Sequence, residues 1–143
     1  MGNLVDLMAE FLCKYKISKL NEIKVVIDDL ICGVERSFDL SEEQKFQIKL
    51  VLSELLINCF KHADASKIHP VQIDAKLHGN HLSFSVLDMG EGFHQQNYNI
   101  NNFDKSEENL YRENGRGLFL ASAMSSMLKF NRKGNKVLAR IDL

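Results

Sequence analysis

The hydrophobic period of this chain changes at Pro70, and this change limits the order of elements that it can form. Before Pro70, apolar residues recur every three or four positions, as in Leu20 to Ile31 and in Val51 to Ala63. After it, they alternate with polar residues from Val71 to Leu77 and again from Leu82 to Val86. We therefore expect helices first and antiparallel hairpins later.

The first part of the chain predicts two helices. Ser18 is a candidate N-cap for a helix that ends near residues 33 to 36. The second helix opens at Ser41, with Gln44 completing a capping box, and runs to about Asp64. At roughly 23 residues it would be about 35 Å long, which is enough to cross a whole sheet.

The segments around these helices predict strands and one further helix. The first hairpin turns on Gly79-Asn80, and a last hairpin, with strands from Met127 to Arg132 and from Lys136 to Leu143, turns on Gly134-Asn135. Leu118 to Met127 reads as a short helix. Residues 1–17 stay open, because Phe11 to Ile17 fits either a helix or an edge strand.

The length of 143 residues predicts a single domain over residues 1–143, since it is enough for one core and too short for two ordinary ones. Helices and hairpins that are segregated along the chain favour an α+β fold, a two-layer α/β sandwich in which helices cover one face of a mixed, mostly antiparallel sheet. The polar tract at residues 94–114 is too long for an ordinary connection in a compact domain, and such a segment is usually a functional loop or lid.

Composition excludes several classes of function. The formal net charge of -1 provides no general attraction for nucleic acid. No apolar run approaches the roughly 20 residues that span a bilayer, and the first residues lack the features of a signal peptide, so we expect a cytoplasmic protein with no membrane contact. Cys13, Cys32 and Cys59 are few and far apart, which predicts free thiols and no metal cluster.

The second helix carries a thin polar seam in an apolar sequence. Glu54, Asn58, Lys61 and His62 fall on one helical face, while leucines and Cys59 cover the other sides. Buried polar groups need partners, so this seam must meet water, a metal, a ligand or other polar groups. Taken alone, it could equally be a solvated stripe on an amphipathic helix.

Two glycine-rich segments offer further candidate sites. Asp88 ends a strand and is followed by Gly90 and Gly92, a spacing that lets the backbone approach a planar ligand beside a carboxylate. Gly115-Arg116-Gly117 precedes a helix, where free N–H groups favour phosphate. Each segment is weak by itself, since the first could be a glycine-rich turn and the second a loop end.

The three segments together resemble the N, G1 and G2 boxes of the GHKL (Bergerat-fold) ATPase superfamily. They are E-x-x-x-N on a long helix, D-x-G-x-G after a strand and G-x-G before a helix, with a polar lid between the last two. The resemblance covers nearly everything from Ser18 to Leu143. The pieces VLSELLINCFKHA, DMGEGF and GRGLFLASAM are most similar to the anti-sigma-factor serine kinases.

This resemblance implies an ATP and Mg²⁺ site. Asp88 would take the adenine amino group, with Gly90 and Gly92 shaping the adenine pocket, and the side-chain oxygen of Asn58 would coordinate Mg²⁺. Where the family usually has Thr in the last hairpin, near the adenine-binding acid, this chain has Asn135.

The same resemblance implies how phosphate is held. Lys61 would reach a phosphate, His62 would border the ribose or the lid, and Gly115, Arg116 and Gly117 would cradle the β and γ phosphates. Phosphoryl transfer requires mainly positioning and charge neutralisation, so this set of groups is sufficient.

The implied activity depends on Glu54. As a general base it would orient a serine hydroxyl, which makes the chain an anti-sigma factor with protein serine kinase activity that phosphorylates an anti-anti-sigma (STAS-like) partner and also binds a sigma factor. Family members often form homodimers. The alternatives are a non-catalytic ATP-binding module that sequesters a regulator, and the catalytic domain of a histidine kinase, which needs no such base.

Overall fold

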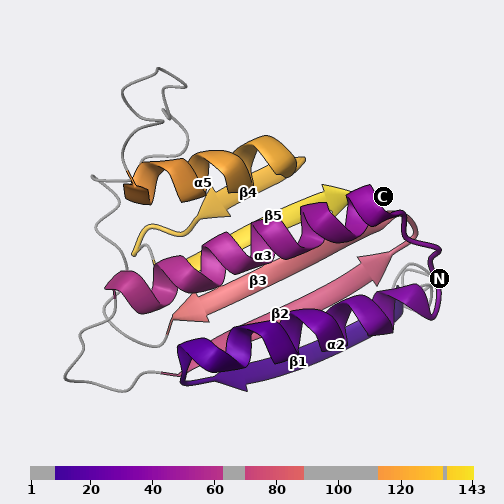
Figure 1. The fold of residues 1–143 in the computed structure, drawn as a ribbon, viewed down its shortest axis with the longest axis horizontal. Helices are drawn as coiled ribbons and strands as arrows, with labels where there is room; N and C mark the ends of the chain where they lie inside the picture. Colours follow the sequence, from indigo (N-terminus) through magenta and orange to yellow (C-terminus); the bar gives the residue numbers. More distant parts are fainter. Residues whose placement is uncertain (1–8, 63–69, 89–112, 134) are drawn as a thin grey trace.

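The computed structural model describes residues 9–62, 70–88, 113–133 and 135–143, and for residues 9–12, 61, 62 and 113–116 it describes the backbone only. These parts form one five-stranded sheet with helices on one face (Figure 1). The elements are β1 Ala9–Ile17, η1 Leu20–Glu22, α2 Ile23–Glu35, α3 Glu42–His62, β2 Val71–His78, β3 His81–Asp88, α5 Glu113–Met124, β4 Met127–Phe130 and β5 Lys136–Asp142.

The strand order is β1-β2-β3-β5-β4, and each neighbouring pair is antiparallel. The predicted α+β sandwich is therefore confirmed, with a sheet that is antiparallel throughout the described strands rather than mixed. Helices α2, α3 and α5 lie across the same face of this sheet (Figure 1). No helix in the described ranges is long and apolar enough to cross a membrane.

The N-terminal segment, left open by the sequence, forms the edge strand β1. It pairs with β2 over its whole length, from Ala9 opposite His78 to Ile17 opposite Val71. The Tyr15 hydroxyl donates a hydrogen bond of 2.6 Å to Asp29 Oδ2 on α2. This bond ties the outer strand to the helix that covers it.

The first helix begins differently from the prediction. Ser18 is not its N-cap, because a 3-10 turn starts at Leu20 with Lys19 as the capping residue. The Glu22 side chain reaches back, and its Oε1 accepts hydrogen bonds from the backbone N–H groups of Ser18 and Lys19 at 3.2 and 3.1 Å. Glu22 therefore fixes the residues ahead of the turn, and no side chain of the predicted N-cap residue Ser18 is needed to begin it. The end of α2 at Glu35 falls within the predicted limits.

The predicted capping box of α3 is confirmed. The Ser41 N–H donates to Gln44 Oε1 at 2.9 Å, and the Gln44 N–H donates to Ser41 Oγ at 3.1 Å. The helix runs without interruption to His62. Asp64, where the prediction ended it, lies outside the described residues.

The first hairpin follows the predicted alternation. On β2, Val71, Ile73, Ala75 and Leu77 are buried, while the residues between them are partly exposed. Gly79 has a φ of +55° and no other described residue has a positive φ, which corresponds to a type II′ turn with glycine at its first central position. The buried faces of both strands pack under the helices.

The third helix is longer at its start and shorter at its end than predicted. It runs from Glu113 to Met124, so Gly115, Arg116 and Gly117 lie within its first turns and not ahead of it. Glycine has low helix propensity, but α5 packs beside α3 and buries Leu118 completely, and tertiary packing outweighs propensity here. Of the predicted lid, residues 94–112 lie outside the described part of the chain.

The last hairpin has a wider connection than the predicted two-residue turn. The Asn131 N–H donates to the Lys136 carbonyl at 3.0 Å, and the Lys136 N–H donates to Asn131 Oδ1 at 3.1 Å. Because these two residues pair, residues 132–135 form the connection, and Gly134 among them lies outside the described residues. The Asn131 side chain thus closes the hairpin that the Gly-Asn pair was expected to close.

Candidate functional site

The three sequence segments that carry the candidate residues meet at one end of the molecule. The C-terminal end of α3, the C-terminal end of β3 and the N-terminal end of α5 lie at the left in Figure 1. This arrangement follows from the direction of the elements, because α5 runs antiparallel to α3 beside it and β3 runs beneath α3 toward the same end. Tertiary structure therefore brings together segments that are far apart in the sequence.

Asn58 is the most unusual residue of this region. It is only 6% exposed, and its Nδ2 has no hydrogen-bond partner in the described part of the protein. A buried polar group without a partner costs about 1–3 kcal/mol, so such groups are rare in stable proteins. This amide is therefore available to a group outside the described residues, such as a ligand.

Glu54 lies one helical turn before Asn58 and contacts the start of α5. A Cβ added to Gly117 would overlap Glu54 Oε2 and would lie 3.2 Å from its Cδ. Only glycine permits this close approach between the carboxylate and the backbone of α5. Glu54 is partly exposed, so its carboxylate can meet solvent or a ligand.

Asp88 is the last residue of β3 and is 5% exposed. Its backbone is held on both sides by Asn135: the Asp88 N–H donates to the Asn135 carbonyl at 2.7 Å, and Asn135 Nδ2 donates to the Asp88 carbonyl at 3.4 Å. Asn135 Oδ1 also accepts a hydrogen bond of 2.7 Å from Asn131 Nδ2.

The two hydrogen bonds between Asn135 and Asp88 were not predicted from the sequence, where Asn135 was noted only as a departure from the usual threonine. The signal in the sequence was the position itself, since a residue in the last hairpin was expected near the acid at the end of β3. The Asn135 amide donates to the Asp88 carbonyl and accepts from Asn131 at the same time, while the Asn135 backbone carbonyl accepts from the Asp88 N–H.

Cys59, next to Asn58 on α3, is a buried thiol that senses the negative charge of Asp88. It is 1% exposed, and burial together with the negative charge of Asp88 raises the pKa of its thiol to about 12. The thiol is therefore neutral at physiological pH and acts as a small apolar group, as the sequence predicted.

The other predicted site residues are described in part or not at all. Lys61 and His62 lie in the last turn of α3, and Gly115 and Arg116 lie in the first turn of α5. For these four residues the structure describes the backbone only. Gly90 and Gly92 fall in a segment that the structure does not describe. Among the described residues, no group of three or more His, Cys, Asp or Glu side chains could hold a metal ion.

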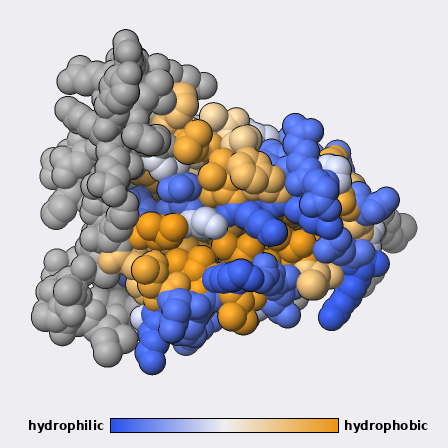
Figure 2. All heavy atoms as spheres, in the orientation of Figure 1, coloured by the Kyte–Doolittle hydropathy of each residue, from blue (hydrophilic) through white to orange (hydrophobic). Residues whose placement is uncertain are grey.

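The helical face also carries an apolar hollow that contains none of the predicted site residues. It measures about 440 Å³ and is lined by Leu20, Ile23 and Ile27 on the η1–α2 side and by Ser53 and Ile57 on α3. In Figure 2, apolar side chains gather on this face between hydrophilic ones. Because no predicted residue lines the hollow, the candidate site is the end of the sheet at Glu54, Asn58 and Asp88.

The chain matches a known protein family over most of its length. The family model described as histidine kinase-like ATPase domain matches residues 19–141, which include all three segments of the site. A search of curated proteins finds no match.

Proposed function

The chain belongs to the histidine kinase-like ATPase family, and we propose that it is an Mg²⁺-dependent protein serine kinase that also acts as an anti-sigma factor. Family membership makes it an ATP-binding module of GHKL type. The observation that carries the more specific proposal is the place of the Glu54 carboxylate, one turn before the buried amide of Asn58 and against the start of α5.

The residues present fit a bound nucleotide with its metal ion. Asn58 is buried, and its amide N–H has no partner among the described residues; rotation about its last side-chain bond exchanges that nitrogen with an oxygen suited to Mg²⁺. Asp88 is a buried carboxylate, able to accept a hydrogen bond from an exocyclic amine such as that of adenine. Bound ATP would supply the phosphoryl group, and Mg²⁺ would neutralise its charge.

The groups around phosphate belong to two helix ends. Lys61 and His62 lie in the last turn of α3, and the backbone of Gly115, Arg116 and Gly117 lies in the first turns of α5. The first four N–H groups of a helix have no acceptor within it, and those of Gly115 and Arg116 are among them. The positive end of the α5 dipole favours an anion at this position. We assign these residues to phosphate binding, with Gly90 and Gly92 completing the adenine pocket.

Glu54 is assigned as the general base. A serine hydroxyl of a partner protein would lose its proton to the Glu54 carboxylate as its oxygen attacks the terminal phosphorus, and the bond between that phosphorus and ADP would break. Partial exposure of Glu54 allows the hydroxyl to approach from solvent. The partner in this proposal is an anti-anti-sigma (STAS-like) protein, and a sigma factor is the regulator that is held, with the chain acting as a homodimer in the cytoplasm.

The test is phosphate transfer from γ-labelled ATP to a serine of the STAS-like protein encoded nearest to this chain. Wild type should label the serine, whereas Glu54→Gln, which keeps the shape of the side chain but cannot accept the proton, should bind ATP without transferring phosphate. Glu43→Gln, on the exposed first turn of the same helix, is the matched control and should behave as wild type.

A second change tests nucleotide binding itself. Asp88→Asn should lose ATP affinity, because an amide in that position can present a donor to the adenine amine. Labelling of serine that persists in Glu54→Gln would contradict the assignment of the base. Tight partner binding without any labelling by wild type would instead identify a non-catalytic ATP-dependent module, and autophosphorylation on histidine would identify a histidine kinase domain.

A further inference from the structure

The sheet face opposite the helices carries an ordered pattern of side chains. Because residues directly opposite each other in antiparallel strands point to the same side, the register defines rows that cross the sheet. Three adjoining rows point away from the helices: Lys16, Gln72, Leu87 and Lys136; Lys14, Asp74, Ser85, Leu138 and Lys129; and Lys76, Ser83, Arg140 and Met127.

Cations dominate these rows and lie on both sides of the central strand β3. Toward one edge are Lys14, Lys16 and Lys76, and toward the other are Lys129, Lys136 and Arg140. Among the described side chains of these strands, the outward carboxylates are Asp74, beside Lys14, and Asp142, which lies 3.5 Å from Arg140 Nε and also pairs with His81. The formal net charge of the whole chain is -1, so this local excess of positive charge is not visible in the overall composition.

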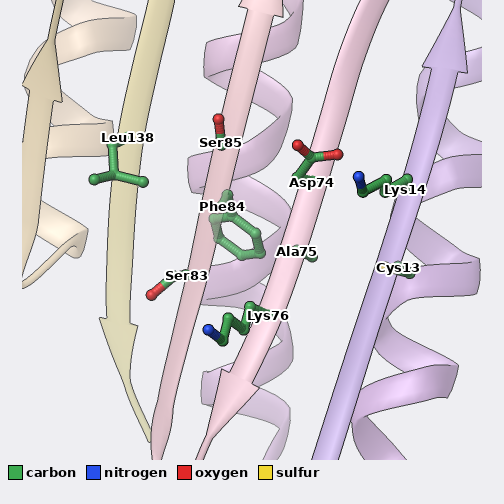
Figure 3. A pocket seen from close by; sticks show the side chains of 9 residues that line it. All are labelled: Cys13, Lys14, Asp74, Ala75, Lys76, Ser83, Phe84, Ser85 and Leu138. Carbon is green, nitrogen blue, oxygen red and sulfur yellow. The ribbon is translucent and has the colours of Figure 1, made fainter. Parts of the chain in front are cut away.

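Between the two sets of cations, the face is hollowed. The hollow measures about 510 Å³ and is bordered by Lys14, Asp74 and Lys76 on one side and by Leu138 on the other. Ser83 and Ser85 on β3 line the bottom of the hollow, and their small side chains leave space above the strand (Figure 3). Leu138 is 39% exposed, so an apolar wall stands beside the charged border.

We propose that this face, which we call the basic trough, docks a protein partner through an acidic segment that carries an apolar side chain. Carboxylates of the partner would pair with Lys76 and Arg140, which flank Ser83, and with the lysines at the ends of the rows. The apolar side chain would occupy the hollow beside Leu138. Complementary charge of this kind increases specificity and the association rate more than it increases affinity.

The composition of the trough favours a protein over other anionic partners. Among the outward residues of the described strands there is no Phe, Tyr or Trp on which the bases of a single-stranded nucleic acid could stack. Among the described side chains of these strands, Leu138 is the exposed large apolar residue, and one such side chain is too little apolar surface for insertion into a bilayer. A second copy joined face to face would bring like charges together. The trough lies on the other side of the sheet from Glu54, so the proposal does not depend on kinase activity.

The experiment is a titration of the isotope-labelled full chain with a synthetic peptide of repeating Glu-Glu-Leu-Ser units, followed by backbone NMR. Signals of β2, β3 and β5 should shift, and the same peptide with Gln in place of Glu should not bind. The double variant Lys14→Glu/Lys136→Glu, with one change on each side of β3, should weaken binding by about tenfold, because two attractions become repulsions.

The matched control is Arg36→Glu/Lys49→Glu, which makes the same change in net charge on exposed positions of the helical side. It should keep the affinity within about twofold, as expected for charges screened beyond a Debye length. If the charge reversal impairs folding, the neutral pair Lys14→Gln/Lys136→Gln provides a milder change. We expect it to cause a smaller loss of peptide affinity.

Several results would overturn the proposal. They are shifts confined to the helical side, equal losses in the test and control variants, and absence of peptide binding by folded wild type. Tighter binding of oligothymidylate, or of vesicles of equimolar phosphatidylcholine and phosphatidylglycerol, to the same strands would assign the trough to nucleic acid or to membrane instead.

Discussion

The carboxylate of Glu54 lies against the Cα of Gly117, and a methyl group at residue 117 cannot be accommodated while the carboxylate keeps this position. The contact joins the middle of α3 to the first turns of α5 and thus couples the proposed base to the proposed phosphate-binding helix end. It gives Gly117 a role besides the proposed contact with phosphate, since the glycine also decides where the Glu54 side chain can lie.

Gly117→Ala should therefore affect catalysis and stability in opposite ways. The added methyl displaces the end of a flexible glutamate at little cost, and alanine gains up to about 1 kcal/mol of helix propensity over glycine. We expect unchanged or slightly raised stability in urea unfolding, with phosphate transfer reduced by about a hundredfold because the base is misplaced.

The double variant Glu54→Ala/Gly117→Ala separates this effect from damage to phosphate binding. If the alanine acts through Glu54, it should lower the transfer rate no further once the carboxylate is gone. A large additional loss in the double variant, or a loss of ATP affinity that accounts for the whole effect in Gly117→Ala, would show that residue 117 acts on the nucleotide alone.

Asn58→Ala should cost little stability in the nucleotide-free protein. Removal of the unpartnered buried amide offsets the lost packing, so we expect a change below about 1 kcal/mol in the free energy of unfolding. The rise in melting temperature on addition of ATP and Mg²⁺ should disappear, because binding to the native state is what stabilises it. Ser53→Ala, on the other side of the same helix, should keep the full rise, and the same rise in Asn58→Ala would remove Asn58 from the site.

Asn135→Ala should loosen the end of β3. The backbone hydrogen bond from Asp88 N–H to the residue 135 carbonyl survives, but the side-chain bond to the Asp88 carbonyl is lost, at about 0.5–1.5 kcal/mol of stability. ATP affinity, measured by calorimetry, should fall severalfold because the acid is less firmly placed. Asn131→Ala is the control: it removes the bonds of Asn131 to Asn135 Oδ1 and to the Lys136 N–H but keeps both Asn135–Asp88 bonds, so it should lower stability and reduce ATP affinity less than Asn135→Ala.

Stability should fall at alkaline pH, in part through Cys59. Its pKa is raised from 9.0 to about 12 in the folded protein, so the unfolded chain loses the thiol proton first as pH rises. This thiol therefore reduces stability between about pH 9 and pH 12, by at most about 1.4 kcal/mol per pH unit. The raised pKa of Tyr15, caused by burial and its bond to Asp29, acts in the same direction.

Urea unfolding at several pH values checks this expectation. Cys59→Ala should show a shallower alkaline loss of stability, whereas Cys32→Ala, at an exposed thiol, should follow wild type. An identical pH dependence in Cys59→Ala and wild type would contradict the role assigned to burial of this thiol.

Local patterns in the sequence were sufficient for most elements of the fold. The capping box at Ser41 and Gln44 and the alternation from Val71 to Leu77 depend on groups that are neighbours in the chain, and both were predicted correctly. The start of α5 was not, because glycines at 115 and 117 suggest a loop, and only packing against α3 makes that segment helical.

For the site, the sequence by itself determined which residue types stand at which spacing, and this was enough to identify the ATPase family. Tertiary structure alone decided which of them meet: Glu54 with Gly117, and Asp88 with Asn135. The same holds for the basic trough, whose cations are scattered along the chain and share a face only through strand register. The physical reason is that spacing along one helix or strand is local geometry, whereas contacts between elements depend on how the whole core packs.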